Sequence, residues 1–270
     1  MHKEVVLRIQ GKILQSISKG QGQTLAIAIP TTGERNMTGL EDGLMTSEEA
    51  GVLHRFEVGI SLLGDWEGHK LTNHQIPGEH AAERIKSIIG SSPLLEVCTG
   101  IGATTFVLAR CFPFVYGIER DERRISLCKH NLVQLGLADK VALITGDALE
   151  ESTWQSIPHT TIRAAYTDVA WRRSGDWRIE ERDITATSPN TQDLFTILTR
   201  HGIRNICMKL SKLSDVTQLR RLGDCEVEYV FADGELSFIF VYFGDLVRSR
   251  SSVFTFSKHA FRQEPGNSVT

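Results

Sequence analysis

Short apolar runs alternate with amphipathic stretches over most of the chain after residue 90. The apolar runs are bounded by Gly, Pro or acidic residues, and the stretches between them repeat apolar positions at helical spacing. The segments on either side of Gly234 predict a closing hairpin, 225–233 and 236–245. Strands are expected at 93–99, 113–119, 140–147 and 205–211, and a strand with the turn after it at 162–171. Helices are expected at 103–111, 121–136, 191–202 and 213–223.

This alternation predicts an α/β fold. We expect a Rossmann-like, doubly wound, mostly parallel seven-stranded sheet with an antiparallel C-terminal hairpin and a small N-terminal extension. With 270 residues, 41% of them hydrophobic, the chain is large enough for one such domain and an extension. Ligands of this fold bind at the carboxyl ends of the strands, so the chemistry is expected there.

The part before residue 90 follows another pattern. Weak alternation at 5–17 and 24–30 predicts short strands, so residues 1–45 are interpreted as a β-rich extension that either recognises substrate or covers a sheet edge. A T-x-x-E capping box at Thr46 and Glu49 predicts a helix over 46–63. A loop and a second helix, 78–89, complete a helical lead-in over 46–90, before the α/β domain at 91–247 and a basic tail at 248–270.

Composition excludes several classes of protein. The net charge of −3 gives no general attraction to nucleic acid, so RNA would have to bind a local basic patch. The five cysteines are scattered without a C-x-x-C pair, which indicates reduced thiols and no metal site. Neither a secretory h-region nor an apolar run of roughly 20 residues occurs, so we expect a cytoplasmic location and no membrane partner. The oligomeric state is not predicted.

The stretch LLEVCTGIGATTFVLAR, residues 94–110, places an acid and a Gly-containing turn between a strand and a helix. A dinucleotide site needs G-x-G-x-x-G/A, but Thr105 occupies the third small position. At roughly 6 Å and an effective dielectric near 20, Glu96 would repel a pyrophosphate charge by about 3 kcal/mol. The same carboxylate favours an ammonium and a sulfonium, so the turn indicates S-adenosylmethionine rather than a nicotinamide cofactor.

Three more carboxylates end predicted strands. Glu119 lies 19 positions after Gly100, where an acid can accept from both ribose hydroxyls. Asp147, in the GDA segment, could accept from an adenine amino group or could be an ordinary turn residue. Asp168 ends the fourth strand, beside the place where a methyl group would emerge.

These residues resemble a family. The pattern LEVCTGIGATTFVLA…VYGIERD…NLVQLGLADKV…GDA resembles class I S-adenosylmethionine-dependent methyltransferases, with Cys98 in place of the first glycine of the common motif. The resemblance implies the cofactor S-adenosyl-L-methionine. The cofactor-binding residues that it implies are Glu96, Cys98, Thr99, Gly100, Gly102, Thr104, Glu119, Arg120, Asp147, Ala148 and Asp168.

A closer resemblance is to trimethylguanosine synthase and its bacterial relatives, the RNA cap guanine N2 methyltransferases. It rests on WEGHKLTNHQIPGEHAAERI, CTGIGATTFVLA and FIFVYFGDLVR and covers about residues 55–248. That family has S-P-P-W at the end of strand four, where this chain has D-V-A-W without the prolines. The resemblance implies that Asp168 orients an acceptor amino group and that Trp171 stacks on its ring, although Trp171 could equally be a packing residue.

Other functions remain open. The stretch DVAWRRSGDWRIEERD also resembles a DPARR-type loop of a methyltransferase branch with a THUMP-like tail. The acceptor is expected to be RNA or a small molecule. The degenerate D-V-A-W motif also allows a non-catalytic relative that binds the cofactor without transferring its methyl group.

Overall fold

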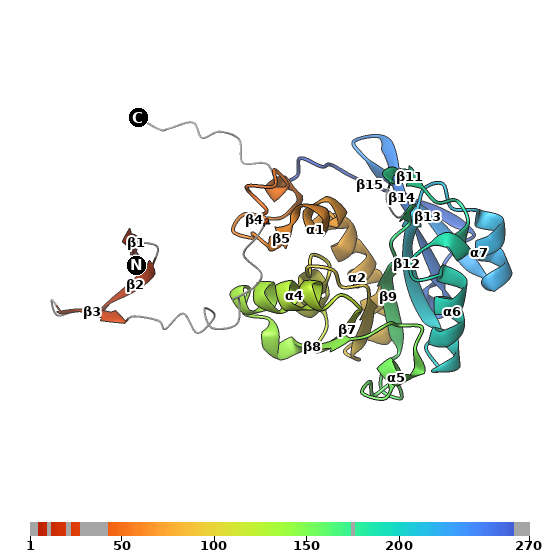
Figure 1. The fold of residues 1–270 in the computed structure, drawn as a ribbon, viewed down its shortest axis with the longest axis horizontal. Coiled ribbons are helices and arrows are strands. Elements are labelled where there is room, and N and C mark those ends of the chain that lie inside the picture. The colour runs from red at the N-terminus through yellow and green to blue at the C-terminus, as the bar shows by residue number, and fades with distance from the viewer. Residues whose placement is uncertain (1–4, 10–11, 20–22, 28–42, 174–175, 262–270) are drawn as a thin grey trace. The chain divides into compact units, whose positions relative to one another are not determined.

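An eight-stranded sheet in the order β15-β13-β14-β12-β9-β6-β7-β8 forms the centre of the fold in this computed structural model (Figure 1). Only β14 runs antiparallel to its neighbours. The strands are β6 (Leu94–Val97), β7 (Val115–Glu119), β8 (Val141–Thr145), β9 (Ala164–Asp168), β12 (Asn205–Ser211), β13 (Cys225–Ala232), β14 (Glu235–Phe243) and β15 (Ser251–Phe256). This confirms the Rossmann-like fold and its hairpin, and adds an eighth strand.

Helices cover both faces of this sheet. Leu95, Met208 and Val241 face a core that also contains residues of α5, α6 and α7, whereas Leu94, Cys207 and Phe240 face the core formed with α2 and α3. Successive strand residues thus point to opposite faces, as strand geometry requires. The helices are α1 (Trp66–Leu71), α2 (Gln75–Ile89), α3 (Thr105–Cys111), α4 (Glu122–Gln134), α5 (Glu151–Trp154), α6 (Thr191–Arg200) and α7 (Val216–Leu222).

The strand order reverses between β6 and β9. The chain leaves β6 through α3 to β7 on one side, and β9 lies on the other side of β6. In open α/β sheets such a switch point leaves a crevice at the carboxyl ends of the two strands. Glu96 and Asp168 belong to these two strands, so the fold places them beside the crevice.

The structure describes residues 5–9, 12–19, 23–27, 43–173 and 176–261, and the chain divides into two units, 1–42 and 43–270. In the first unit, β1 (Val5–Ile9), β2 (Lys12–Lys19) and β3 (Gln23–Ile27) form an antiparallel meander. The second unit also contains two small antiparallel pairs, β4 (Leu44–Thr46) with β5 (Leu63–Asp65), and β10 (Arg172–Arg173) with β11 (Asp176–Glu180). No described helix has both the length and the hydrophobicity to cross a membrane.

Two expectations about secondary structure are wrong. The capping box forms, because Thr46 N–H donates to Glu49 Oε2 at 2.7 Å, but turns and one short 3-10 helix (Leu53–Arg55) follow it in place of a helix over 46–63. Gly51 at φ +70° and Gly59 at φ +91° hold this segment in turns. The expected loop after it contains β5 and α1. Within the basic tail, Ser251–Phe256 form β15, which pairs in parallel with β13.

Candidate active site

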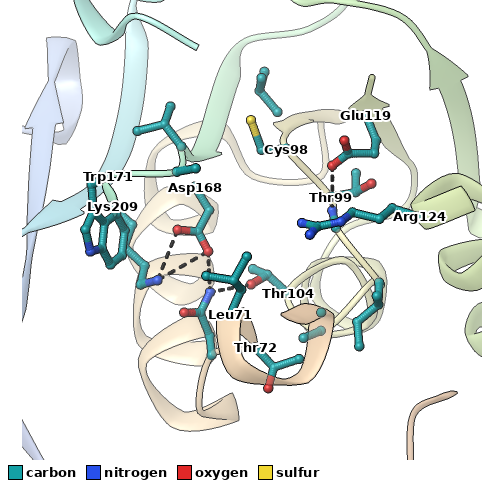
Figure 2. Close-up of a pocket in the computed structure, with 18 of the residues that line it drawn as sticks. Leu71, Thr72, Cys98, Thr99, Thr104, Glu119, Arg124, Asp168, Trp171 and Lys209 are labelled. Atoms are coloured by element: carbon teal, nitrogen blue, oxygen red, sulfur yellow. Dashed lines mark hydrogen bonds and ion pairs between the residues drawn. The ribbon is translucent and has the colours of Figure 1, made fainter. Parts of the chain in front are cut away.

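A cleft of about 420 Å³ opens at the carboxyl ends of β6, β7 and β9. Its lining includes the turn after β6, the ends of β7 and β9, and the segment that joins α1 to α2. Figure 2 shows Glu119 and Arg124 on one side of it, Trp171 and Lys209 on the other, and Asp168 between them.

The turn between β6 and α3 depends on left-handed backbone. Cys98, Gly100 and Gly102 have φ values of +70°, +55° and +92°. A Cβ atom on Gly102 would lie 2.9 Å from Cys128 Sγ, so the turn packs tightly on α4 there. A Cβ on Gly100 would meet no atom within 4 Å, so the chain leaves open space beside this backbone. Glycine at this position therefore allows a ligand to approach the main chain.

The Glu119 carboxylate joins this turn to the end of β7. Oε2 accepts from Gly100 N–H at 2.9 Å, and Oε1 accepts from Asp121 N–H at 3.1 Å. A carboxylate offers about four acceptor sites, so these two bonds leave capacity for the hydroxyl groups of a ligand. Glu119 lines the cleft, and its orientation is fixed before any ligand arrives.

Glu96 lies beneath the turn and outside the lining of the cleft. Its side chain is 1% exposed, and no hydrogen bond of normal geometry reaches either carboxylate oxygen within the described part of the chain. The pKa of Glu96 is raised to about 8, mainly by burial and to a smaller extent by the charges of Asp168 and Glu119, while the Thr105 hydroxyl offsets only part of the shift. A cation bound in the cleft would favour the ionised form of this carboxyl group.

The remaining residues on the Glu119 side come from the turns after β7 and β8. Arg120 and Ala148 line the cleft together with Asp147, whose Oδ1 accepts from Leu149 N–H at 2.9 Å. This bond explains the local turn and leaves Oδ2 of Asp147 for another donor. Thr99 is 4% exposed, and its hydroxyl has no partner within the described ranges.

Asp168, at the end of β9, is held from two directions. Asn73 Nδ2 donates to its Oδ2 at 2.6 Å, and Lys209 Nζ lies 3.0 Å from Oδ1 and 3.3 Å from Oδ2 (Figure 2). The same Asn73 amide lies 3.0 Å from Thr104 Oγ1, at the start of α3. The side chains of Asp168 and Lys209 are only 16% and 6% exposed. Asp168 is thus a mostly buried carboxylate in a fixed orientation.

The loop after Asp168 is fixed by main-chain hydrogen bonds. Ala170 and Ser188 exchange two N–H···O bonds of 2.8 Å each, and Glu181 N–H donates to the Trp171 carbonyl at 2.7 Å. The Lys209 ammonium lies 4.2 Å from the centroid of the Trp171 ring and 5.1 Å from that of Phe238. An acceptor that stacks on Trp171 therefore shares this ring with Lys209.

His74 adds a neutral polar group to the lining. Burial lowers its pKa to about 3, helped by the nearby charges of Arg55, His54 and Lys258. Its ring lies 5.3 Å from that of Phe256 on β15 and 5.7 Å from that of His54. The imidazole is therefore uncharged at physiological pH and lies beside aromatic rings.

Most of the residues selected from sequence meet in this cleft. The two that do not line it are Glu96, beneath the turn, and Gly102, packed on α4. Those that line it are Cys98, Thr99, Gly100, Thr104, Glu119, Arg120, Asp147, Ala148, Asp168 and Trp171.

Sequence reasoning missed Asn73, His74 and Lys209. Asn73 and His74 lie in a segment that is expected to be a loop and that carries part of the family resemblance, but neither side chain was assigned a role. Lys209 had a detectable signal, because a lysine inside the apolar run NICMKLS must be buried, and buried lysines need a partner.

The cleft fits S-adenosylmethionine chemically. A buried carboxyl group without hydrogen bonds, Glu96, lies where a cation would offset its cost of burial. The open side of Gly100 admits a ligand to the main chain, and the fixed carboxylate of Glu119 suits a pair of hydroxyl groups. A sulfonium nucleoside with an ammonium group provides each of these partners.

The family model described as RNA cap guanine-N2 methyltransferase matches residues 91–246, which is more than half of the chain. The match spans β6 to β14 and so includes the glycine turn and the strand ends that line the cleft.

Several solved structures are similar to this chain. A protein of Porphyromonas gingivalis W83 assigned as a methyltransferase is 21% identical over 68% of this chain and 43% of that chain, with a TM-score of 0.55. This chain thus matches less than half the length of that protein. SMU.1697c of Streptococcus mutans, solved with S-adenosylhomocysteine, is 17% identical over 62% of this chain and 97% of that chain, with a TM-score of 0.44. TrmK of M. capricolum, also in complex with S-adenosylhomocysteine, is 12% identical over 64% and 70%, with a TM-score of 0.43.

Proposed function

The chain belongs to the RNA cap guanine-N2 methyltransferase family, and we propose that it methylates a nitrogen of a planar acceptor such as the exocyclic amino group of guanine in RNA. It is a methyltransferase with the class I fold, and its cofactor is S-adenosylmethionine. The proposal concerns the acceptor and the roles of the individual residues.

The cofactor supplies an activated methyl group, so the protein mainly provides alignment and electrostatics. On the Glu119 side, the carboxylate of Glu119 accepts from ribose hydroxyls while it keeps its bond to Gly100. Asp147 accepts from an adenine amino group through the oxygen that its own turn does not use. Glu96 acts through the turn as the buried charge that favours the ammonium.

Asp168 is the residue that orients the acceptor. Its position at the end of β9, between the two sides of the cleft, is the observation that carries the proposal. With Asn73 and Lys209 as described partners, Oδ1 keeps acceptor capacity for one N–H of an incoming amine. That hydrogen bond aligns the nitrogen lone pair with the methyl group, and the proton that the methylated nitrogen loses passes to Asp168 or to solvent at the cleft mouth.

The cleft favours a flat acceptor through its aromatic residues. Trp171, Phe238 and neutral His74 all line it, and stacking of a base on an aromatic ring contributes roughly 1–3 kcal/mol. The ammonium of Lys209 lies over the Trp171 ring. An acceptor ring therefore stacks on another aromatic residue of the cleft or displaces Lys209 from Trp171.

Methyl-labelled S-adenosylmethionine tests the proposal. The purified chain is incubated with it and with separate RNA, protein and small-metabolite pools, and labelled RNA is then digested to nucleosides. The proposal predicts label in RNA as N2-methylated guanosine. Label confined to small metabolites would show that the acceptor is a small molecule and not RNA. Label in no pool would support a non-catalytic cofactor binder.

A further inference from the structure

We propose that Lys209 is a positioning residue that fixes the Asp168 carboxylate for the acceptor and so replaces the rigidity of the two prolines absent from D-V-A-W. The inference rests on the proposed function, because it assigns Lys209 a role in the same transfer. Lys209 comes from β12, a strand outside the loop that it organises.

The ammonium of Lys209 contacts both ends of the D-V-A-W motif. Its ammonium reaches both oxygens of Asp168, at 3.0 and 3.3 Å, and lies 4.2 Å from the Trp171 ring centroid. With 6% of its side chain exposed, Lys209 has lost most of its hydration, and these contacts offset that cost. One ammonium therefore joins the first and last residues of the D-V-A-W motif, Asp168 and Trp171.

The register of the sheet fixes the contact between Lys209 and Asp168. Lys209 and Asp168 are paired directly across the parallel strands β12 and β9, so their side chains leave the same face of the sheet. A direct cross-strand neighbour fixes a carboxylate more firmly than a contact from a long loop would.

The other partner of Asp168 points to positioning as well. The amide of Asn73 lies within 3.0 Å of both Asp168 Oδ2 and Thr104 Oγ1, and therefore connects the acceptor side to the start of α3, next to the glycine turn. Lys209 and Asn73 come from different elements and make their shortest contacts with different oxygens of the carboxylate. Its rotation is therefore restricted, although Val169 and Ala170 lack proline rings.

A purely structural lysine would act differently from a positioning one. If Lys209 only stabilised the fold, its loss would slow transfer whatever residue occupied position 168. If it acts through Asp168, its loss has no further effect once that carboxylate is gone, which makes the two losses non-additive.

The experiment is a double-mutant cycle on the full chain. Wild type, Lys209→Met, Asp168→Asn and the double variant are compared for cofactor affinity by calorimetry and for methyl transfer to the pool that wild type labels. Lys209→Gln, which keeps an N–H donor without the charge, is the second variant in case Lys209→Met does not fold. Lys212→Met, an exposed lysine just after β12, is the matched control.

We expect Lys209→Met to lower kcat by about 10²-fold while cofactor Kd changes by less than about twofold, since small misplacements of a reacting pair have effects of this size. The double variant should be no slower than Asp168→Asn, and Lys209→Gln should show a smaller loss with the same non-additivity. If the kcat losses of the two single variants multiply in the double variant, or if Lys209→Met has the kcat of wild type, the inference is overturned while the proposed function stands. Absence of label from every pool with wild type would overturn the proposed function, and the inference with it.

Discussion

The main-chain N–H of Gly100 donates to Oε2 of Glu119 at 2.9 Å, and this bond joins the turn after β6 to the end of β7. The carboxylate therefore shapes the turn and faces the cleft at the same time. A residue with both functions should be sensitive to any change.

We expect Glu119→Ala to weaken cofactor binding by about 10- to 100-fold, the range that corresponds to losing one hydrogen bond to a charged group. Calorimetric titration with S-adenosylmethionine measures the change. Glu122→Ala, at an exposed acid in the first turn of α4, is the control and should bind as wild type does. An affinity of Glu119→Ala equal to that of the control would remove Glu119 from the cofactor site.

The Glu96 carboxyl group should make the stability of the cofactor-free protein depend on pH. Its pKa is about 8 in the folded chain, against a value near 4.5 for an ordinary Glu, so the folded state retains a proton that the unfolded state has lost. Its stabilising contribution is complete below about pH 4.5 and is lost as the pH rises toward 8, by a total on the order of 3–5 kcal/mol.

Glu96→Gln should abolish that part of the pH dependence, because an amide of the same shape does not titrate. Thermal denaturation of both proteins between pH 5 and 9 measures the difference. The variant should gain stability relative to wild type as the pH rises. Parallel curves for the two proteins would show that Glu96 has an ordinary pKa.

The same carboxyl group should release its proton when the cofactor binds. At pH 7 the group is mostly protonated in the free protein, and a nearby ammonium favours the ionised form. Calorimetric titrations in buffers of different ionisation enthalpy measure proton release, which should approach one proton in wild type and disappear in Glu96→Gln. Equal proton release by both proteins would assign the effect to another group.

Cys98 occupies a position where the backbone favours glycine. Its φ of +70° costs an L-residue about 1–2 kcal/mol, and burial raises its thiol pKa, so we assign it no thiolate chemistry. Cys98→Gly should retain cofactor binding, whereas Cys98→Val should lower the melting temperature, because β-branched residues fit this conformation poorly. Equal stability of the two variants would contradict the role of backbone strain at this turn.

The glycine turn, the strands around it and the acids at their ends could be predicted because their signals are local. Strand, turn and helix follow one another between Leu94 and Cys111, and the acids at 119 and 168 are the last residues of β7 and β9. Parallel strands in one sheet end at the same edge, so the prediction of a shared site required no tertiary information.

The errors arise where tertiary contacts outweigh local preference. Thr46 and Glu49 form their capping box, yet the chain turns at Gly51 and pairs β4 with β5 in place of continuing a helix. The helix α1 was not predicted because its sequence contains Gly68, which is typical of loops. In the structure α1 begins at Trp66 because Asp65 accepts from Gly68 N–H. The partners of Asp168 lie 95 and 41 positions away from it in the chain, and no local pattern connects them.

The central claim is that Asp168 acts on the acceptor and not on the cofactor. The most direct test is to measure cofactor affinity and the rate of labelled methyl transfer in the same preparation of Asp168→Ala, with Asp193→Ala, at an exposed acid of α6, as control. The account predicts a cofactor Kd within about threefold of wild type and a transfer rate lower by about 10²-fold or more. Wild-type transfer by Asp168→Ala, or loss of cofactor binding equal to the loss of transfer, would contradict it.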